Sequence, residues 1–122
     1  MLVDGRFDPT QYSELEIEVA FDDFVTNVKA LVADHYATRF PTLKPSPIEV
    51  TGGRSYWKIV KVDGHNGSKS VYGFVRKADG AILKAANWNA PYVRGNNYVR
   101  GYVMQEQAIL AATPYGIIYQ RG

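Results

Sequence analysis

The sequence predicts an α+β fold in which an antiparallel β-sheet, arranged as a meander, packs against a long N-terminal amphipathic helix. Two observations predict this class. Apolar residues recur with the period of a helix in the first third of the chain, and short β-forming runs separated by turn residues fill the rest. Because 122 residues suit one hydrophobic core, we expect a single domain over 1–122.

The N-terminal residues predict an arm followed by an ambiguous segment. Residues 1–14 include Gly5 and Pro9 among polar neighbours, so we expect an arm that orders by packing or by meeting another subunit. Residues 15–19 alternate between apolar and acidic side chains, which fits either a strand or a backward extension of the next helix. Of the two, we favour an extended segment.

A helix is predicted over 21–40. Asp22 and Asp23 suit the positive end of its dipole, Arg39 suits the negative end, and Pro41 stops it. Its apolar residues follow the i, i+3, i+4, i+7 spacing that places them on one face: Phe21, Phe24, Val25, Val28, Leu31, Val32, Tyr36 and Phe40.

The sheet is predicted within 48–122. Asp79-Gly80 marks a hairpin turn, because glycine supplies the positive φ that a tight turn needs. We expect strands at 48–51, 54–62, 69–77 and 81–85. The remaining expectations are a turn at 63–67, a basic and ordered loop at 86–102, a short helix at 105–112 and a closing strand at 115–119.

Several classes of chemistry lack their residues or motifs. Cysteine is absent, which excludes disulfides, thiolate catalysis and Cys-based zinc sites, and the only histidines are His35 and His65. Metalloprotease, serine-hydrolase and phosphate-loop motifs are missing as well. We therefore expect no catalytic residue, metal or cofactor. A nucleotide hydrolase stays open, because carboxylates distant in sequence can meet in space.

The chain also lacks the features of a membrane protein or a secreted one. No apolar run approaches the length of a membrane span, and the first ten residues do not resemble a signal peptide. We expect a cytoplasmic protein without a membrane partner.

Charge is distributed unevenly along the chain. Residues 1–50 carry nine acidic and four basic side chains: Asp4, Asp8, Glu14, Glu16, Glu18, Asp22, Asp23, Asp34 and Glu49 against Arg6, Lys29, Arg39 and Lys44. Residues 54–101 carry nine basic and two acidic ones: Arg54, Lys58, Lys61, Lys69, Arg76, Lys77, Lys84, Arg94 and Arg100 against Asp63 and Asp79. The second half therefore favours an anionic partner, and the complementary halves favour self-association into a homo-oligomer.

Aromatic residues alternate with the cations of this basic half. Aromatic faces stack on nucleobases while Arg and Lys neutralise phosphates, so the mixture indicates nucleotide binding. Four of the aromatic side chains fit a sheet-on-helix core equally well, and this choice stays open from the sequence: Tyr56, Trp57, Tyr72 and Phe74. Alternation places Tyr56 and Lys58 on one face of their strand and Trp57 on the other.

The basic loop is harder to explain by packing alone. Gly95, between Arg94 and Asn96, tolerates a positive φ that would turn backbone N–H groups toward an anion. The candidate ligand-binding residues are Arg54, Tyr56, Lys84, Trp88, Arg94, Asn96 and Arg100. Trp88 or a tyrosine would stack on a base, and the arginines would hold phosphate.

Part of this half resembles small proteins that are common in tailed phages. The likeness covers roughly residues 54–98 and rests on three stretches: Ser70-Val71-Tyr72-Gly73-Phe74, then Gly80-Ala81-Ile82-Leu83-Lys84-Ala85-Ala86 with Trp88, then Pro91 with Arg94-Gly95-Asn96. This family in turn looks like the phage Thoeris anti-defence proteins, sponges that sequester cyclic ADP-ribose-type immune signals without degrading them.

The resemblance implies a homo-oligomeric viral protein in the cytoplasm of an infected bacterial host. It would bind a small cyclic nucleotide, of the cyclic ADP-ribose type or a cyclic oligonucleotide, and would not cleave it. On this reading Arg54, Lys84, Trp88, Arg94 and Asn96 would contact phosphate and base. The alternatives are a single-stranded nucleic-acid-binding protein, which the net charge of +2 argues against, and a virion or assembly protein.

Overall fold

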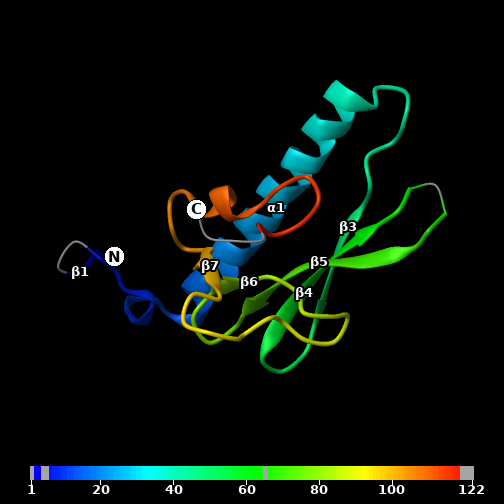
Figure 1. The fold of residues 1–122 in the computed structure, drawn as a ribbon. Coiled ribbons are helices and arrows are strands. Elements are labelled where there is room, and N and C mark those ends of the chain that lie inside the picture. The colour runs from blue at the N-terminus through cyan, green and yellow to red at the C-terminus, as the bar shows by residue number, and fades with distance from the viewer. Residues whose placement is uncertain (1, 4–5, 65, 119–122) are drawn as a thin grey trace.

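A computed structural model describes residues 2–3, 6–64 and 66–118. One long helix, α1, packs against a five-stranded antiparallel sheet whose strands follow each other in chain order (Figure 1). The elements are β1 Leu2–Val3, β2 Arg6–Phe7, η1 Pro9–Gln11, α1 Glu14–Arg39, β3 Ile48–Gly52, β4 Tyr56–Val62, β5 Lys69–Arg76, β6 Ala81–Leu83, β7 Val99–Tyr102 and η2 Ala108–Ala111. The predicted α+β class with a meander on a helix is confirmed.

Helix α1 begins at Glu14, so the expected extended segment at 15–19 is wrong. A capping box starts the helix: the Ser13 hydroxyl accepts from the Glu16 N–H at 3.1 Å, and the Glu16 carboxylate accepts from the Ser13 N–H at 2.8 Å. Of the three apolar residues in this segment, only Ile17 is buried, while Leu15 and Val19 are exposed. In this turn of the helix only Ile17 contacts the core, and the apolar Leu15 and Val19 on either side of it face solvent.

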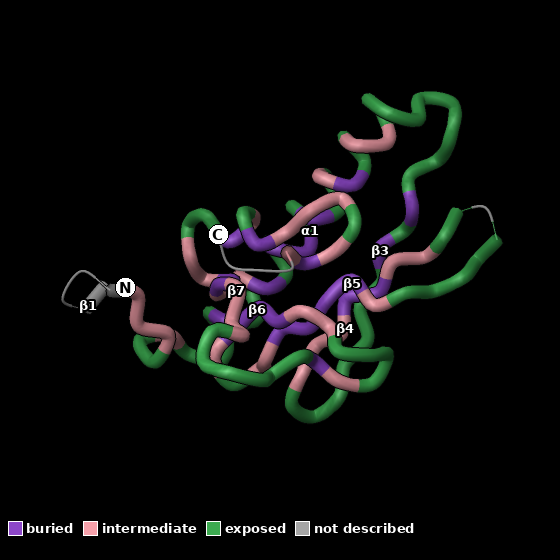
Figure 2. Tube along the Cα trace, viewed as in Figure 1, coloured by how far each residue is buried: buried purple, intermediate pink, exposed green. Residues whose placement is uncertain are grey.

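The main core lies between α1 and one face of the sheet (Figure 2). The predicted helical face is confirmed at its central residues, which are buried: Phe21, Phe24, Val25, Val28 and Val32. Phe40, also predicted on this face, caps the end of the helix and is exposed. Phe21 stacks on Trp57 of β4, with ring centroids 4.2 Å apart and planes 10° from parallel. The sheet contributes Ile48, Ile59, Tyr72, Val75 and Ile82 to this core.

The C-terminal part lies against the α1 side of the sheet. The β4–β5 pairing is irregular at Ile59/Val60, and there the Tyr72 C=O accepts from the Ile117 N–H at 3.1 Å. The expected closing strand at 115–119 is reduced to a single bridge between Ala112 and Ile117, and Tyr119 lies outside the described residues. The expected helix at 105–112 is only the short 3₁₀ helix η2.

A second, smaller cluster covers the face of the sheet that points away from α1. Phe74, Ala81 and Leu83 form it, with Tyr56 and Tyr98 packed against them. The chain from 84 to 98 runs over this side as an ordered loop (yellow in Figure 1). The predicted basic loop thus ends before residue 99, because the last residues of its range form β7, which pairs with β6.

Among the described residues, no helix combines the length and the apolar character that crossing a membrane requires.

Candidate ligand-binding site

Trp88 and Lys58 meet on the sheet face that points away from α1. Lys58 lies on β4 between Trp57 and Ile59, whose side chains join the α1 core, so alternation directs Lys58 to the opposite face. Its ammonium nitrogen is 4.1 Å from the centroid of the Trp88 ring, a cation–π contact. Trp88 keeps 46% of its surface exposed. An exposed indole therefore lies beside a fixed positive charge.

The loop that carries Trp88 is held by its own hydrogen bonds. The Asn87 side chain accepts from the N–H groups of Asn89 and Ala90, at 2.8 and 3.1 Å. The Tyr92 N–H donates to the Lys84 C=O at 2.7 Å, next to a bridge between Ala85 and Pro91. These contacts close the part of the loop around Trp88, between residues 84 and 92.

The Arg94-Gly95-Asn96 turn has the backbone shape that its sequence predicts. Gly95 has a φ of 78°, and a Cβ atom there would meet nothing within 4 Å. Arg94 and Asn96 are both exposed, as are Tyr92 and Val93 before them. The guanidinium and the neighbouring N–H groups are accessible to an anion from solvent.

Arg54 lies at the turn between β3 and β4, at one end of the candidate site. The Gly53 N–H closes this turn on the Tyr56 C=O at 3.0 Å, and Arg54 is exposed. Arg54 precedes Lys58 by four positions, which corresponds to at most roughly 13 Å along the chain.

Three predicted site residues are more enclosed. The half-buried Tyr56 contacts Phe74 edge to face, with centroids 6.1 Å apart, so it contributes to the second core cluster. Lys84 is half-buried at the end of β6, with its ammonium 3.5 Å from the Ala85 C=O. Arg100 donates from Nε to the Ile118 C=O at 3.1 Å and from Nη1 to the Asn97 C=O at 2.8 Å. Arg100 thus ties the loop to the C-terminal segment, and its role toward a ligand stays a prediction.

The aromatic residues left open by the sequence are core residues. Trp57 and Tyr72 pack in the α1 core, while Phe74 centres the second cluster. The Tyr72 hydroxyl donates to the Thr113 C=O, and burial raises the pKa of this phenol above its ordinary value of 10.0.

Lys58 is the residue that the sequence-based site omitted. Its strand alternation already placed it on the face of Tyr56, but the contact with Trp88 depends on how the loop folds back. Two other cations of the basic half are engaged by carboxylates: Lys69 with Glu49 at 3.2 Å and Arg76 with Asp79 at 2.8 Å. The hydrogen bonds that Arg76 donates to the Asp79 carboxylate raise the pKa of the guanidinium further.

The histidines lie away from this loop or outside the described residues. His35, on α1, contacts Tyr36, Phe40 and Tyr115, and its Nε2 is 3.3 Å from the Tyr115 hydroxyl. His65 is not among the described residues. Within the part of the chain that the structure describes, no three His, Asp or Glu side chains gather as metal ligands would.

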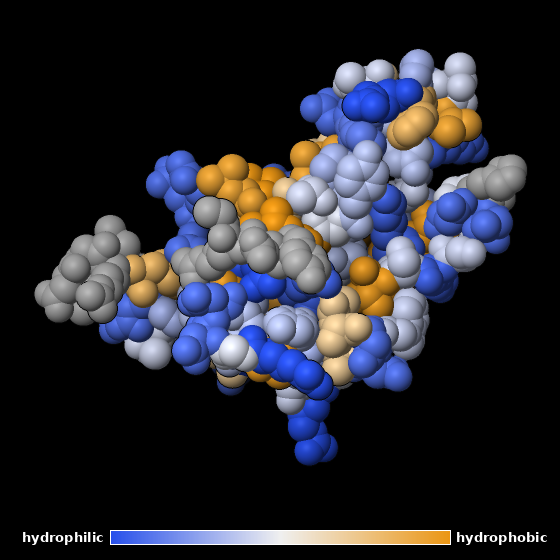
Figure 3. Space-filling model, in the orientation of Figure 1, coloured by the Kyte–Doolittle hydropathy of each residue, from blue (hydrophilic) through white to orange (hydrophobic). Residues whose placement is uncertain are grey.

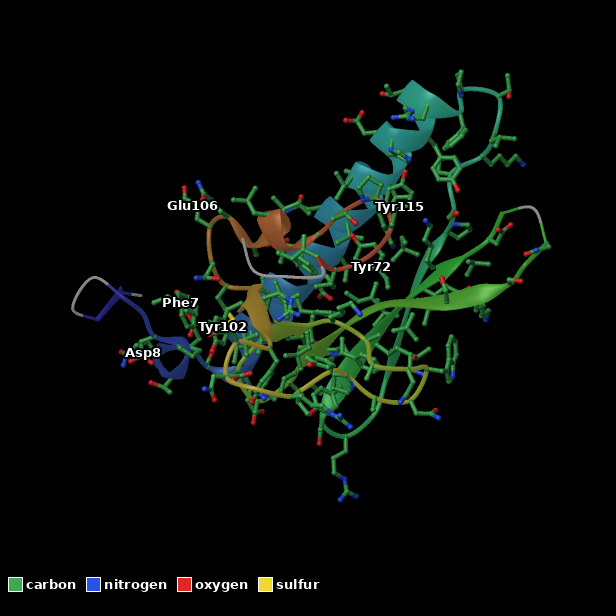
Figure 4. All side chains as sticks on the ribbon, viewed as in Figure 1. Phe7, Asp8, Tyr72, Tyr102, Glu106 and Tyr115 are labelled. Carbon is green, nitrogen blue, oxygen red and sulfur yellow. The ribbon has the colours of Figure 1, made fainter. Side chains whose placement is uncertain are left out.

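The largest of the described surface hollows lies away from the Trp88 loop. It has a volume of about 590 Å³ and lies between the N-terminal arm and residues 104–107, lined by Phe7, Tyr12 and Leu110 among others. Phe7 packs beside Tyr102 at a centroid distance of 5.0 Å, with Glu106 near the rim (Figure 4). Apolar surface gathers over η2 nearby (Figure 3), where Leu110 is exposed. None of the seven predicted site residues lines this hollow.

Comparison with known proteins places the chain in a family. No curated protein matches it, and no solved structure does. The model of DUF7717, a family of unknown function, matches residues 11–108. This match includes α1, all five strands of the sheet and the whole Trp88 loop. The chain therefore belongs to the DUF7717 family.

Proposed function

We propose that this protein binds a small phosphate-bearing nucleotide on the loop 84–98 and holds it without cleaving it. The ligand class is a cyclic nucleotide signal, of the cyclic ADP-ribose type or a cyclic oligonucleotide, and the role is phage anti-defence by sequestration. The observation that carries the proposal is the exposed Trp88 ring beside the Lys58 ammonium, on the same ordered loop as the Arg94-Gly95-Asn96 turn.

The two parts of the loop suit the two parts of a nucleotide. An exposed indole offers a stacking face to a base, which contributes about 1–3 kcal/mol per base in single-strand binders. The Arg94 guanidinium offers a planar fork to phosphate oxygens, and Gly95 at positive φ lets neighbouring N–H groups converge on the same anion. Stacking and phosphate contact together select a nucleotide over inorganic phosphate.

Local charge supports an anionic ligand. The acidic residues of 54–101 are Asp63 and Asp79, and the carboxylate of Asp79 is bound to Arg76 through two hydrogen bonds. Lys58, Arg94 and Arg54 place basic side chains on the side of the sheet or at the turn that a ligand would approach. A phosphate brought there meets a net positive field.

The same surface also suits single-stranded nucleic acid, which is the competing function. A strand would continue past the loop along other cations, so its affinity would rise with length and fall steeply with salt. A small nucleotide makes few phosphate contacts and saturates at a fixed stoichiometry. Length and salt dependence therefore separate the two functions, while a virion or assembly protein would bind neither class.

Calorimetric titration of the purified protein with cyclic ADP-ribose isomers and cyclic di- and trinucleotides tests the proposal. We expect saturable binding of at least one member, weakened by Trp88→Ala and by Arg94→Ala. Tyr115→Ala is the matched control for Trp88, because Tyr115 is an exposed aromatic residue that contacts α1. Arg39→Ala on α1 is the control for Arg94. Equal loss in the controls, or binding of oligonucleotides alone, would overturn the proposal.

A further inference from the structure

Strand β3 leaves one edge of the sheet open. It pairs with β4 alone, in an uninterrupted antiparallel register from Ile48 opposite Lys61 to Gly52 opposite Trp57. The Val62 N–H donates to the Pro47 C=O at 2.9 Å, and the Gly53 N–H donates to the Tyr56 C=O at 3.0 Å. Residues 47, 49, 51 and 53 thus direct their backbone groups toward β4.

The backbone groups of the alternate residues point outward. Successive residues of a strand direct their backbone groups to opposite sides. The N–H and C=O groups of Ile48, Val50 and Gly52 therefore face away from β4. In the described part of the chain, no hydrogen bond outside the β3–β4 pair involves these groups. Val50 is also 42% exposed. The edge therefore presents a row of donors and acceptors beside an accessible apolar side chain.

This edge has few of the devices that usually prevent strand pairing. Edge strands in monomers are commonly protected by charged side chains, proline, a bulge or a covering segment. The Ile48–Gly52 strand contains no lysine, proline or register shift, Pro47 lies just before it, and its one charged side chain, Glu49, is paired with Lys69. The opposite edge differs: the β6–β7 pairing shifts register at Ile82/Leu83, and Arg100 of β7 binds the Ile118 carbonyl. Of the two edges of the five-stranded sheet, as far as the structure describes them, the β3 edge is the more open to another strand.

We propose that β3 pairs antiparallel with β3 of a second copy of this chain, joining two sheets into one. A two-fold axis at Val50 brings Val50 opposite its own copy and Ile48 opposite Gly52. In this register Glu49 faces Thr51 of the second copy, so no like charges oppose each other. The carboxylate of Glu49 is already compensated by Lys69 at 3.2 Å. The strand is thus complementary to itself.

The size of the edge sets the strength of the dimer. Five residues per chain form a small contact, below the roughly 1,200 Å² that stable interfaces bury. We therefore expect reversible association that depends on protein concentration. The contact uses the β3 edge and not the Trp88 loop, so the dimer can exist or fail independently of nucleotide binding.

Sedimentation velocity over a hundredfold range of protein concentration tests the dimer. The wild type is compared with substitutions of Val50, whose backbone groups face away from β4. Val50→Pro removes an outward N–H and leaves the bonds to β4 intact, and we expect at least tenfold weaker association. Val50→Thr keeps the N–H and should still dimerise. Val50→Lys places a positive charge on the edge, which opposes pairing with another strand, and replaces Val50→Pro in the test if that variant does not fold.

Amide hydrogen exchange gives a second readout on the unmodified protein. We expect the Val50 amide to exchange more slowly as the concentration rises, while the Glu49 amide, which faces β4, keeps the same protection throughout. A wild type that is monomeric at all concentrations would overturn the proposal. A dimer that persists unchanged in both Val50→Pro and Val50→Lys would do the same, and would place the interface elsewhere.

Discussion

The ammonium nitrogen of Lys58 lies 4.1 Å above the ring of Trp88, which joins the centre of β4 to the middle of a loop thirty residues further along the chain. A cation in this position holds the indole in place and raises the positive potential where a phosphate would bind. The candidate site therefore consists of a strand residue that fixes the geometry and a loop residue that offers the stacking face.

Removing the indole should weaken nucleotide binding. Trp88→Ala deletes the stacking surface, so we expect a loss of about 1–3 kcal/mol, which is roughly 5- to 150-fold in Kd. Lys58→Met keeps an aliphatic side chain over the ring and removes the charge, so we expect a smaller loss of binding free energy than for Trp88→Ala. Calorimetry with the best ligand of the panel measures both. An unchanged Kd for Trp88→Ala would exclude this loop as the stacking site.

The close packing of Gly73 against Ile117 makes a second prediction. A methyl group at Gly73 would overlap the Ile117 side chain, so Gly73→Ala should destabilise the fold by about 1–3 kcal/mol in urea unfolding. Gly53→Ala is the matched control, because a Cβ there meets nothing within 4 Å. Combined with Ile117→Ala, the Gly73→Ala cost should shrink, since the overlapping atoms are gone. If the stability costs of Gly73→Ala and Ile117→Ala simply add in the double variant, overlap with Ile117 is not the cause of the Gly73→Ala destabilisation.

Core packing of α1 on β4 makes a third prediction. Phe21 is 3% exposed and stacked on Trp57, so Phe21→Ala should lower the free energy of unfolding by about 3–5 kcal/mol. The change should also alter the fluorescence of Trp57, which a Trp88→Phe background isolates. Val19→Ala, on the exposed side of the same helix, should change stability by less than about 0.5 kcal/mol. Similar costs for the two variants would contradict the assigned core.

The start of α1 is a pH-sensitive element. Bonds from the Ser13 backbone N–H and from its side chain hold the pKa of the Glu16 carboxyl below its ordinary value of 4.5. A lowered folded pKa means that the ionised box stabilises the helix above about pH 4.5 and that this contribution is lost as pH falls through the folded pKa.

The box is tested by removing its hydroxyl. Ser13→Ala should cost about 0.5–2 kcal/mol at neutral pH and move the Glu16 pKa upward in an NMR titration. The difference in stability from wild type should narrow in acid, where the carboxyl is protonated. Thr10→Ala in the preceding turn is the control for the titration, since Thr10 binds Asp8 and the Glu16 pKa should stay unchanged. An equal Ser13→Ala cost at pH 7 and pH 3 would contradict this role of the box.

The sequence was sufficient for most of the fold. The period of Phe21, Phe24, Val28 and Val32 defined the buried helical face, and Gly80, with a φ of 74°, turns the chain as Asp79-Gly80 predicts. The sequence does not define the helix start, because the apolar residues of 15–19 fit both the two-residue period of a strand and the period of a helix. The capping box of Ser13 and Glu16 shows that the segment is helical. The strand predicted at 115–119 is not formed by residues 115–118, the part of it that the structure describes. Its backbone N–H groups bind the carbonyls of Tyr72 and Ala111, and an apolar run in the sequence does not show that these isolated bonds replace a regular strand pairing.

The candidate site was less predictable. Trp88, Arg94 and Asn96 are predicted from the sequence because aromatic and cationic residues in a Gly- and Asn-rich loop suit a ligand, and all three are exposed in the structure. Their role toward a ligand stays a prediction. Lys58 was missed, since its contact depends on the path of the loop over the sheet. The carbonyl partners of Arg100 could not be foreseen either, because they come from chain segments whose positions only the fold defines.

The most direct test of the central claim is to saturate the protein with the ligand that calorimetry identifies, denature it by heat and analyse the released nucleotide by chromatography. The account predicts a fixed stoichiometry and quantitative recovery of intact ligand, with recovery reduced in Trp88→Ala. Recovery of a cleaved product would make the protein an enzyme, and the absence of any bound nucleotide from the whole panel would contradict the proposed function.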